Sequence, residues 1–330
     1  MRVVPPVRCS VYSAGLALLL VGCGGGAPTA PHAEGPDLRD PPPSTLRSVA
    51  VPALTLRVLR VDAPTGGGGD AVVMADSAAG GPWYALIDAG GDDVAARYLD
   101  DAGIDTLDLL VLTHAHSDHF GGMQDVFDRM HVRRFVYNGQ ARALASYQRV
   151  LERARMEADT VIVLSAPHEI SFGTADGAHA VLLPPLDTWL TENTDDGSLL
   201  NEGSLGLRVQ VGSFAYLGTG DAEIQANRRF ADSYPDWVDA DALKAGHHGS
   251  TDAVQSFWLD AVSPELVVVS ANGTTHPHGA ALDMYRARTP DLFCTPDHGI
   301  VTVRVSAAGD YAVRTERDPR ARCTPGTLVR

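Results

Sequence analysis

Three histidines and one aspartate lie within six positions in the segment 113–119, which reads Thr-His-Ala-His-Ser-Asp-His. An apolar-rich run, Leu107–Leu112, comes directly before it and has the length of a buried strand. Neutral imidazole nitrogens and carboxylate oxygens are ligand types that Zn²⁺ takes. A rigid strand end that presents this set into a loop therefore predicts a metal site, rather than polar residues scattered over a surface loop.

The pattern His-x-His-x-Asp-His resembles the signature of the metallo-β-lactamase superfamily. The resemblance implies that His114 and His116 bind a first metal and that Asp118 and His119 bind a second. It also implies an α/β fold of the αββα sandwich type, a single domain in which two sheets face each other with helices outside. The expected strands and helices alone indicate only a mixed α/β fold.

Apolar runs and their periodicity predict the main elements. The expected strands are 54–61, 71–75, 83–87, 107–112, 132–137, 160–164, 179–183, 205–211, 214–218, 241–245, 266–270, 301–305 and 311–313. The expected helices are 92–102, 121–130 and 140–157. A glycine run at 66–69, followed by Asp70, is expected to form a flexible turn.

Asp221 follows a glycine turn at the end of an expected strand. The resemblance implies that its carboxylate bridges the two metals. It could instead cap the helix that follows, because Asp is favoured at helix N-termini. Many superfamily members supply a third His to the first metal, and Asn201 stands at that place here. A shell of His114, His116 and Asp221 alone suggests looser binding at that site, or a metal other than zinc, such as Mn²⁺.

A second histidine-rich segment, 244–250, reads Lys-Ala-Gly-His-His-Gly-Ser. It resembles one branch of the superfamily, the extracytosolic hydrolase domain of the DNA-uptake protein ComEC and its free-standing relatives. The resemblance extends over roughly residues 54–315. We expect His247 to be the last ligand of the second metal, because it follows Gly246 directly at a strand end, with His248 behind it. A solvated pair of histidines is the alternative.

The first 23 residues resemble a lipoprotein signal peptide. A basic start with Arg2 and Arg8 precedes a short apolar stretch, Val11–Val21, which is too short to span a bilayer. The segment ends in Leu-Val-Gly-Cys, which resembles the bacterial lipobox and implies cleavage before Cys23 and lipidation of its thiol. An ordinary signal peptide with an incidental Cys is the alternative. We expect an exported protein with a lipid anchor on the periplasmic or extracellular face of a bacterial membrane.

Residues 24–50 are rich in Gly and Pro and lack apolar periodicity, which predicts a disordered tether. Residues 51–330 then form the hydrolase domain. Beyond the signal peptide and its lipobox, Cys294 and Cys323 remain. Because exported proteins meet oxidising conditions, we expect these two to form a disulfide. Free thiols or metal ligands are the alternative.

The chain carries a formal net charge of −15, and removal of Arg2 and Arg8 with the signal peptide takes this to −17. So acidic a surface repels polyanions at long range. It therefore argues against tight non-specific binding of nucleic acid, which depends on contacts from Lys and Arg to phosphate.

The resemblance implies a hydrolase with two divalent metal ions, Zn²⁺ or alternatively Mn²⁺, and a metal-bound hydroxide as nucleophile. The ComEC-like branch implies phosphodiester cleavage, and the charge favours a small phosphodiester or nucleotide over long DNA. Asp118 is expected to orient the nucleophile. The candidates for protonating the leaving group are His248, His276 and His278, although the last two also fit a surface loop. A carbonyl substrate (β-lactam, lactone or thioester) is the alternative reaction, and a non-catalytic metal-binding lipoprotein is the alternative class.

Overall fold

The computed structural model describes residues 49, 51–61, 69–77, 82–172, 177–190 and 194–328. The expected signal peptide with Cys23, and the expected tether up to residue 48, lie outside these residues. Within the described part, no helix combines the length and the apolar character needed to cross a bilayer.

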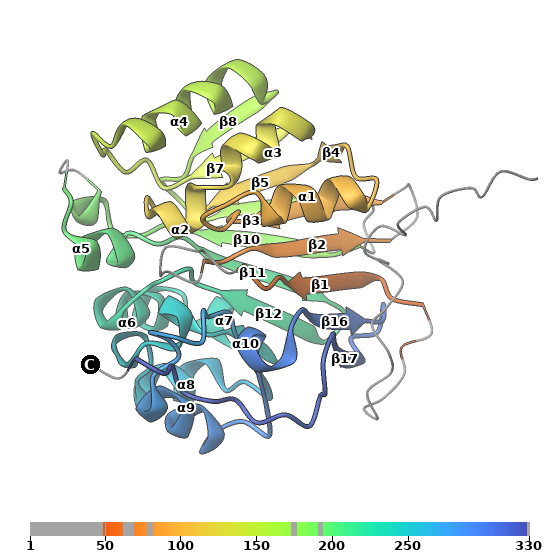
Figure 1. Ribbon diagram of the computed structural model, residues 1–330. Helices are drawn as coiled ribbons and strands as arrows, with labels where there is room; N and C mark the ends of the chain where they lie inside the picture. The colour runs from red at the N-terminus through yellow and green to blue at the C-terminus, as the bar shows by residue number, and fades with distance from the viewer. Residues whose placement is uncertain are drawn as a thin grey trace, which may run out of the picture. The chain divides into compact units, whose positions relative to one another are not determined.

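Two large sheets form the centre of the described chain (Figure 1). The first has the strand order β17-β16-β1-β2-β3-β5-β7-β8 and the second the order β15-β14-β13-β12-β11-β10-β9. The strands of the first sheet are β1 (Leu54–Val58), β2 (Val72–Asp76), β3 (Trp83–Ile87), β5 (Leu109–Leu112), β7 (Arg134–Tyr137), β8 (Thr160–Val163), β16 (Val301–Val305) and β17 (Tyr311–Thr315). Those of the second are β9 (His168–Ser171), β10 (His179–Leu183), β11 (Gly206–Val211), β12 (Phe214–Gly218), β13 (Ala242–Lys244), β14 (Leu266–Val269) and β15 (Asp291–Cys294). The short strands β4 (Thr106–Leu107) and β6 (His131–Val132) pair with each other.

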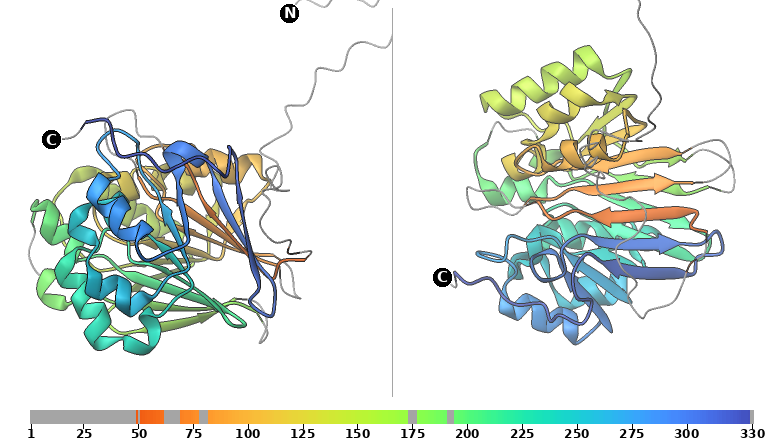
Figure 2. Two further views of the ribbon diagram at one scale, coloured as in Figure 1. Left: turned by 90° about the horizontal axis from the view of Figure 1, so that it is seen from below. Right: turned by 45° about the vertical axis from the view of Figure 1, so that its right-hand side comes forward.

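Helices cover the outer faces of both sheets (Figure 2). On the first sheet these are α1 (Val94–Asp101), α2 (Ser117–Phe120), α3 (Met123–Arg129) and α4 (Ala145–Glu157). On the second they are α6 (Ile224–Ser233), α7 (Pro235–Val238), α8 (Ser256–Val262) and α9 (Gly279–Arg286). Shorter elements are α5 (Gly197–Glu202), α10 (Thr295–His298), η1 (Asp187–Trp189), η2 (Gly246–Gly249) and η3 (Thr251–Ala253).

Alternation along the strands explains this layering, because successive side chains of a strand point to opposite faces. In β5, Leu109 and Val111 join the apolar cluster between the two sheets. Leu110 and Leu112 join the cluster under α1, α3 and α4. Each sheet is therefore apolar on both faces, and the observed helix–sheet–sheet–helix order confirms the αββα sandwich.

A disulfide joins Cys294 to Cys323, the pair that the sequence put forward. Their Cα atoms are 5.4 Å apart. Cys294 ends β15, at one edge of the second sheet, and Cys323 lies in the segment after β17. The bond therefore attaches the C-terminal segment to the second sheet.

Candidate metal centre

The predicted ligands meet where strands of both sheets end. His114 and His116 lie between β5 and α2, and Asp118 and His119 lie in α2 itself. Asp221 follows β12, and the two histidines of η2 follow β13. β12 and β13 are parallel neighbours, so their carboxyl ends lie at the same edge of the second sheet. This topology brings residues from both halves of the chain together.

The first ligand set consists of His114, His116 and Asp221, whose ligand atoms lie within 4.8 Å of one another. His114 Nε2 is 2.9 Å from His116 Nδ1 and 3.9 Å from Asp221 Oδ2. Burial lowers the pKa of His114 well below its ordinary value and also lowers the pKa of His116. Both rings are therefore neutral at neutral pH, which is the form that binds metal.

The second set consists of Asp118, His119 and His248. His248 Nε2 lies 3.3 Å from Asp118 Oδ2 and 3.3 Å from Asp221 Oδ2, and His119 Nε2 lies 3.2 Å from Asp221 Oδ2. Zinc bonds of about 2.0–2.1 Å in a tetrahedral site place ligand atoms roughly 3.3 Å apart. These spacings therefore suit a bound cation.

Buried atoms without partners support the same conclusion. Within the described residues, Nε2 of His119, Nε2 of His248 and Oδ1 of Asp221 are buried and lack a hydrogen bond of suitable geometry. Proteins rarely leave buried polar atoms in this state, and a bound ion is one way in which such atoms are satisfied. The residues present thus fit a metal centre.

The charge on His119 depends on its neighbours. Burial disfavours the charged ring, but the surrounding carboxylates, above all that of Asp221, outweigh burial and raise the pKa of His119 well above its ordinary value. Burial would raise the pKa of Asp221, but His119 and His248 hold it well below its usual range. A cation that binds here therefore has to displace a proton from His119.

The structure directs His248, and not the expected His247, toward this centre. Both residues have left-handed backbone conformations, with φ of 42° and 53°, which side-chain-bearing residues rarely adopt. The resulting turn buries His248, whose Nδ1 lies 3.1 Å from the carbonyl oxygen of Ser270. His247 is left partly exposed, with Nδ1 3.4 Å from Glu223 Oε1. The geometry therefore favours His248 as the ligand.

The helix-cap alternative for Asp221 does not agree with the structure, because α6 begins at Ile224 with Glu223 at its N-cap. Instead, the turn before Asp221 presses against the histidine motif. Gly220 has φ of 53°, and a Cβ there would lie 2.7 Å from Thr113 Oγ1. Only glycine fits this conformation and this close approach, which explains the Gly-Asp pair.

Asp88 is a site residue that the sequence analysis missed. It follows β3 with φ of 56°. Its Oδ2 lies 2.8 Å from His119 Nδ1 and accepts a hydrogen bond of 2.7 Å from the hydroxyl of Thr113, while its Oδ1 accepts one of 2.8 Å from the Thr113 amide. A carboxylate on the far nitrogen fixes the ring orientation of a metal-binding histidine. Asp88 therefore aims His119 Nε2 at the centre.

The Asp88→Asn variant is expected to bind metal roughly 10–100-fold more weakly. The reason is that a neutral amide is a weaker hydrogen-bond acceptor for the His119 ring than a carboxylate. Asn tolerates the left-handed conformation, so the fold should persist. Competition with a chromophoric chelator measures the affinity. Asp108→Asn is the control, since Asp108 accepts from Tyr84 and Arg133 instead. Equal affinities for the Asp88 variant and the wild type would contradict this role.

A buried ion pair, Asp70 with Lys244, was also missed. Lys244 Nζ contacts the Asp70 carboxylate, lies 3.8 Å from Asp221 Oδ1, and donates to the Gly220 carbonyl oxygen at 3.2 Å. Burial lowers the pKa of Lys244 to about 7. Asp70 and Lys244 are separated by 174 positions, so no local pattern could have paired them. Lys244 therefore lies beside the Asp221 carboxylate and holds the turn that carries it.

The remaining candidates lie around the centre. The His276 ring is 6.0 Å from that of His248 and stacks on His278 at 4.7 Å. Burial and the neighbouring histidines lower the pKa of His276 to about 4, so it is uncharged at neutral pH, which argues against its expected role as proton donor. Asn201 donates to Glu223 Oε1 at 2.8 Å.

Comparison with known proteins agrees with this fold. Residues 64–273 match the family model described as the metallo-beta-lactamase superfamily, and the chain belongs to that superfamily of metal-dependent hydrolases. It is similar to ComE operon protein 3 of Bacillus subtilis (strain 168), with 27% identity over 231 residues, 68% of this chain and 28% of that protein. It is also similar to Competence protein ComA of Neisseria gonorrhoeae, with 32% identity over 214 residues, 64% of this chain and 26% of that protein.

These relatives confirm the ComEC-like resemblance, and the chain spans about a quarter of their length. Among solved structures, the metallo-beta-lactamase fold protein YhfI from Bacillus subtilis aligns with a TM-score of 0.48 and 11% identity, over 78% of this chain and 99% of that one.

Proposed function

We propose that this protein is a phosphodiesterase that uses two divalent metal ions, Zn²⁺ or Mn²⁺, to hydrolyse a small phosphodiester or nucleotide. One observation carries the proposal: Asp221 Oδ2 lies 3.9 Å from His114 Nε2 and 3.2 Å from His119 Nε2, so the two ligand sets share this carboxylate. Paired ions about 3.5–4 Å apart suit in-line displacement at phosphorus. When bound, such ions lower the pKa of water and polarise the phosphoryl oxygen.

Asp118 supplies a carboxylate on the open side of the centre. Its side chain is 26% exposed, whereas those of His248 and Asp221 are at most 4% exposed. Burial would raise the pKa of Asp118, but His119 and His248 outweigh it and hold that pKa well below its usual range. Asp118 is thus ionised at neutral pH and can accept a hydrogen bond from the attacking water and orient it.

Arg142 fixes the loop that carries the first ligand set. Its Nη1 donates to the carbonyl oxygen of Ala115, at 2.5 Å, and its Nε pairs with Asp195 at 3.0 Å. Ala115 lies between His114 and His116, so this contact holds the backbone from which both rings project. Preorganised ligands of this kind keep the reacting groups in position.

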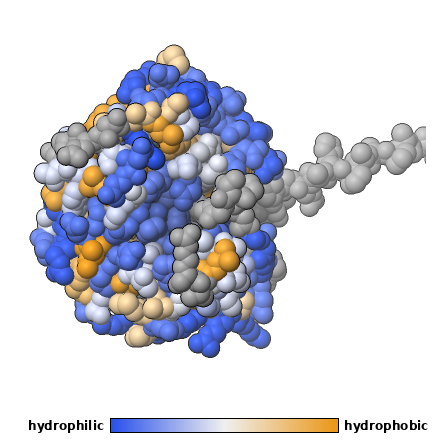
Figure 3. Space-filling view, turned by 60° about the vertical axis from the view of Figure 1, so that its left-hand side comes forward, coloured by the Kyte–Doolittle hydropathy of each residue, from blue (hydrophilic) through white to orange (hydrophobic). Residues whose placement is uncertain are grey.

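Charge supports a small substrate. The chain has a formal net charge of −15. The face that carries α5 and α6 is mainly hydrophilic at its centre, with separate hydrophobic patches (Figure 3). Long nucleic acid needs many contacts from Lys and Arg to phosphate. A short diester that fills the metal centre needs few.

The metal-replete protein is expected to hold close to two ions per chain and to hydrolyse bis-p-nitrophenyl phosphate but not nitrocefin. Elemental analysis and initial rates on both substrates test this. A protein that holds metal and hydrolyses nitrocefin but not bis-p-nitrophenyl phosphate would support the carbonyl-hydrolase alternative. Faster cleavage of plasmid DNA than of a dinucleotide, at equal phosphodiester concentration, would contradict the small-substrate proposal. If the metal-replete protein held no metal, the proposal that it is a metal-dependent enzyme would be contradicted.

A further inference from the structure

A cavity of about 590 Å³ lies beside the metal centre. Its lining comes from Thr251, from residues 275–278 of the loop 272–278 and from Gly279 at the start of α9. The C-terminal segment 321–328, here called the strap, contributes Pro325, Gly326 and Leu328. The volume lies within the usual range for small-molecule sites, about 300–1,000 Å³.

The cavity and the metal centre share a wall. The turn that presents His248 continues into Gly249, where a Cβ would lie only 2.8 Å from Pro277 Cβ. On the same side, the ring of His276 lies between the cavity and the centre, 6.0 Å from the ring of His248. A molecule bound at the centre therefore has the cavity as its neighbour.

Hydrogen bonds and the disulfide hold both the loop and the strap in place. The side-chain oxygen of Asn272 accepts from the amides of Thr274 and Thr275, at 2.8 and 3.0 Å. The strap pairs with this loop, because Gly326 N donates to Pro277 O at 2.8 Å and Leu328 N donates to Thr274 O at 2.7 Å. Cys323 anchors the strap through its disulfide. A preformed cavity binds at lower entropic cost.

Among the described residues that line the cavity, none carries an acidic or basic side chain of the Asp, Glu, Lys or Arg type, although the chain as a whole is acidic. The stacked rings of His276 and His278 meet the apolar side chains of Pro277, Pro325 and Leu328. Leu328 is 64% exposed and borders the cavity. Flat apolar walls of this kind suit an uncharged planar ring.

We propose that the strap cavity holds a planar ring of the substrate, a nucleobase or an aryl group, while its phosphate lies at the metal centre. The phosphate part of this assignment rests on the proposed function. The ring part rests on the cavity alone, so the two can be tested separately.

The test compares equilibrium binding of adenosine 5′-monophosphate and ribose 5-phosphate to the metal-loaded full chain, because the second probe carries a hydroxyl in place of the base. Adenosine monophosphate is expected to bind about tenfold more tightly, the lower part of the range for stacking of one base. Gly279→Phe should remove the preference and leave the affinity for ribose 5-phosphate and the metal content unchanged. A Cβ at Gly279 meets only Pro325, at 3.7 Å, so a ring can enter there.

Ser256→Phe is the matched control, because it adds the same ring at the exposed first position of α8 and should keep the tenfold preference. Leu328→Ala changes only the exposed rim and should reduce the preference about threefold, which keeps the test decisive if Gly279→Phe does not fold. No preference in the wild type, or an unchanged preference in both cavity variants, would overturn the assignment. Preference without diester turnover would support the cavity and overturn the proposed function, and turnover without preference would do the reverse.

Discussion

The Asp221→Ala variant is expected to lose both metal ions and to hydrolyse phosphodiesters at least about a thousandfold more slowly, which corresponds to several kcal/mol of barrier. The reason is its position, because one carboxylate oxygen approaches His114, His119 and His248 at 3.9, 3.2 and 3.3 Å. Asp221 is thus a carboxylate that approaches histidines of both sets. Elemental analysis and rates measured on the same preparation test the two losses together.

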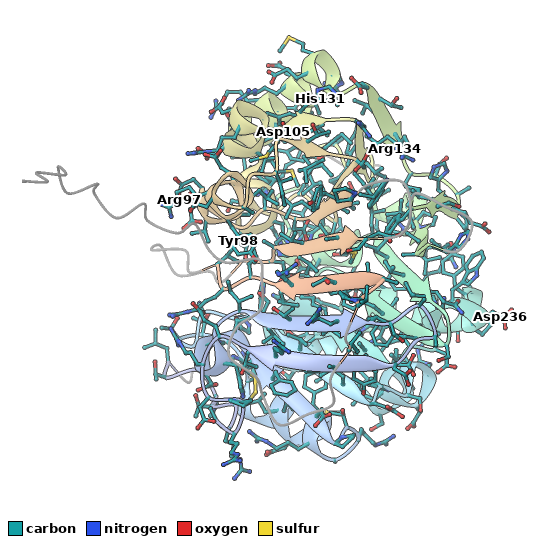
Figure 4. All side chains as sticks on the ribbon, turned by 90° about the vertical axis from the view of Figure 1, so that its right-hand side faces the viewer. Arg97, Tyr98, Asp105, His131, Arg134 and Asp236 are labelled. Atoms are coloured by element: carbon teal, nitrogen blue, oxygen red, sulfur yellow. A yellow bond between two sulfur atoms is a disulfide. The ribbon has the colours of Figure 1, made fainter. Side chains whose placement is uncertain are left out.

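Asp236→Ala provides the control for this variant. It removes one carboxylate of the same type from the exposed surface of α7, on the side of the molecule shown in Figure 4. It should retain full metal and full rate. If Asp221→Ala retained full metal and full rate, the shared carboxylate would not be a bridge. The two-metal proposal would then be contradicted.

The second large effect distinguishes two adjacent residues. His248→Ala is expected to lose about one of two metal ions and about a hundredfold or more in rate, because its Nε2 lies 3.3 Å from both Asp118 and Asp221. His247→Ala should keep both ions and lose less than about tenfold, since its ring pairs with Glu223 at the edge of the centre.

The pair is well matched, because both residues have φ near 50° and each Ala variant therefore has a similar backbone cost. Metal content and rate should be measured on variants of equal thermal stability. The opposite order of effects would restore His247 as the ligand.

The local part of the site could be predicted because its signal is local. His114, His116, Asp118 and His119 lie within one loop and one helical turn, directly after a strand whose apolar run is plain in the sequence. The choice between His247 and His248 could not be predicted, because both occupy the same strand end and only the handedness of the backbone decides which ring is buried.

Site residues that come from distant segments also could not be predicted from the sequence. Asp88 lies in Asp-Ala-Gly-Gly, which is typical of an ordinary turn, and its role depends on the parallel pairing of β3 with β5. Among the elements, β3, β10, β12 and β16 have their predicted bounds, because apolar residues are concentrated in them. β9 was missed because three of its four residues are polar. A helix was expected after Asp221, but the bounds of α6 could not be predicted because its apolar positions are few.

The supply of ligands by both sheets has a consequence for the order of maturation. Before the sheets dock, the local cluster 114–119 is separated from Asp221 and His248, which follow strands far along the sequence. Contacts of such long range form late in folding, after loop closure has been completed. If the protein binds two ions as proposed, capture at the complete site is therefore expected late in folding, and the fraction of chains with two ions would report how many have docked their two sheets.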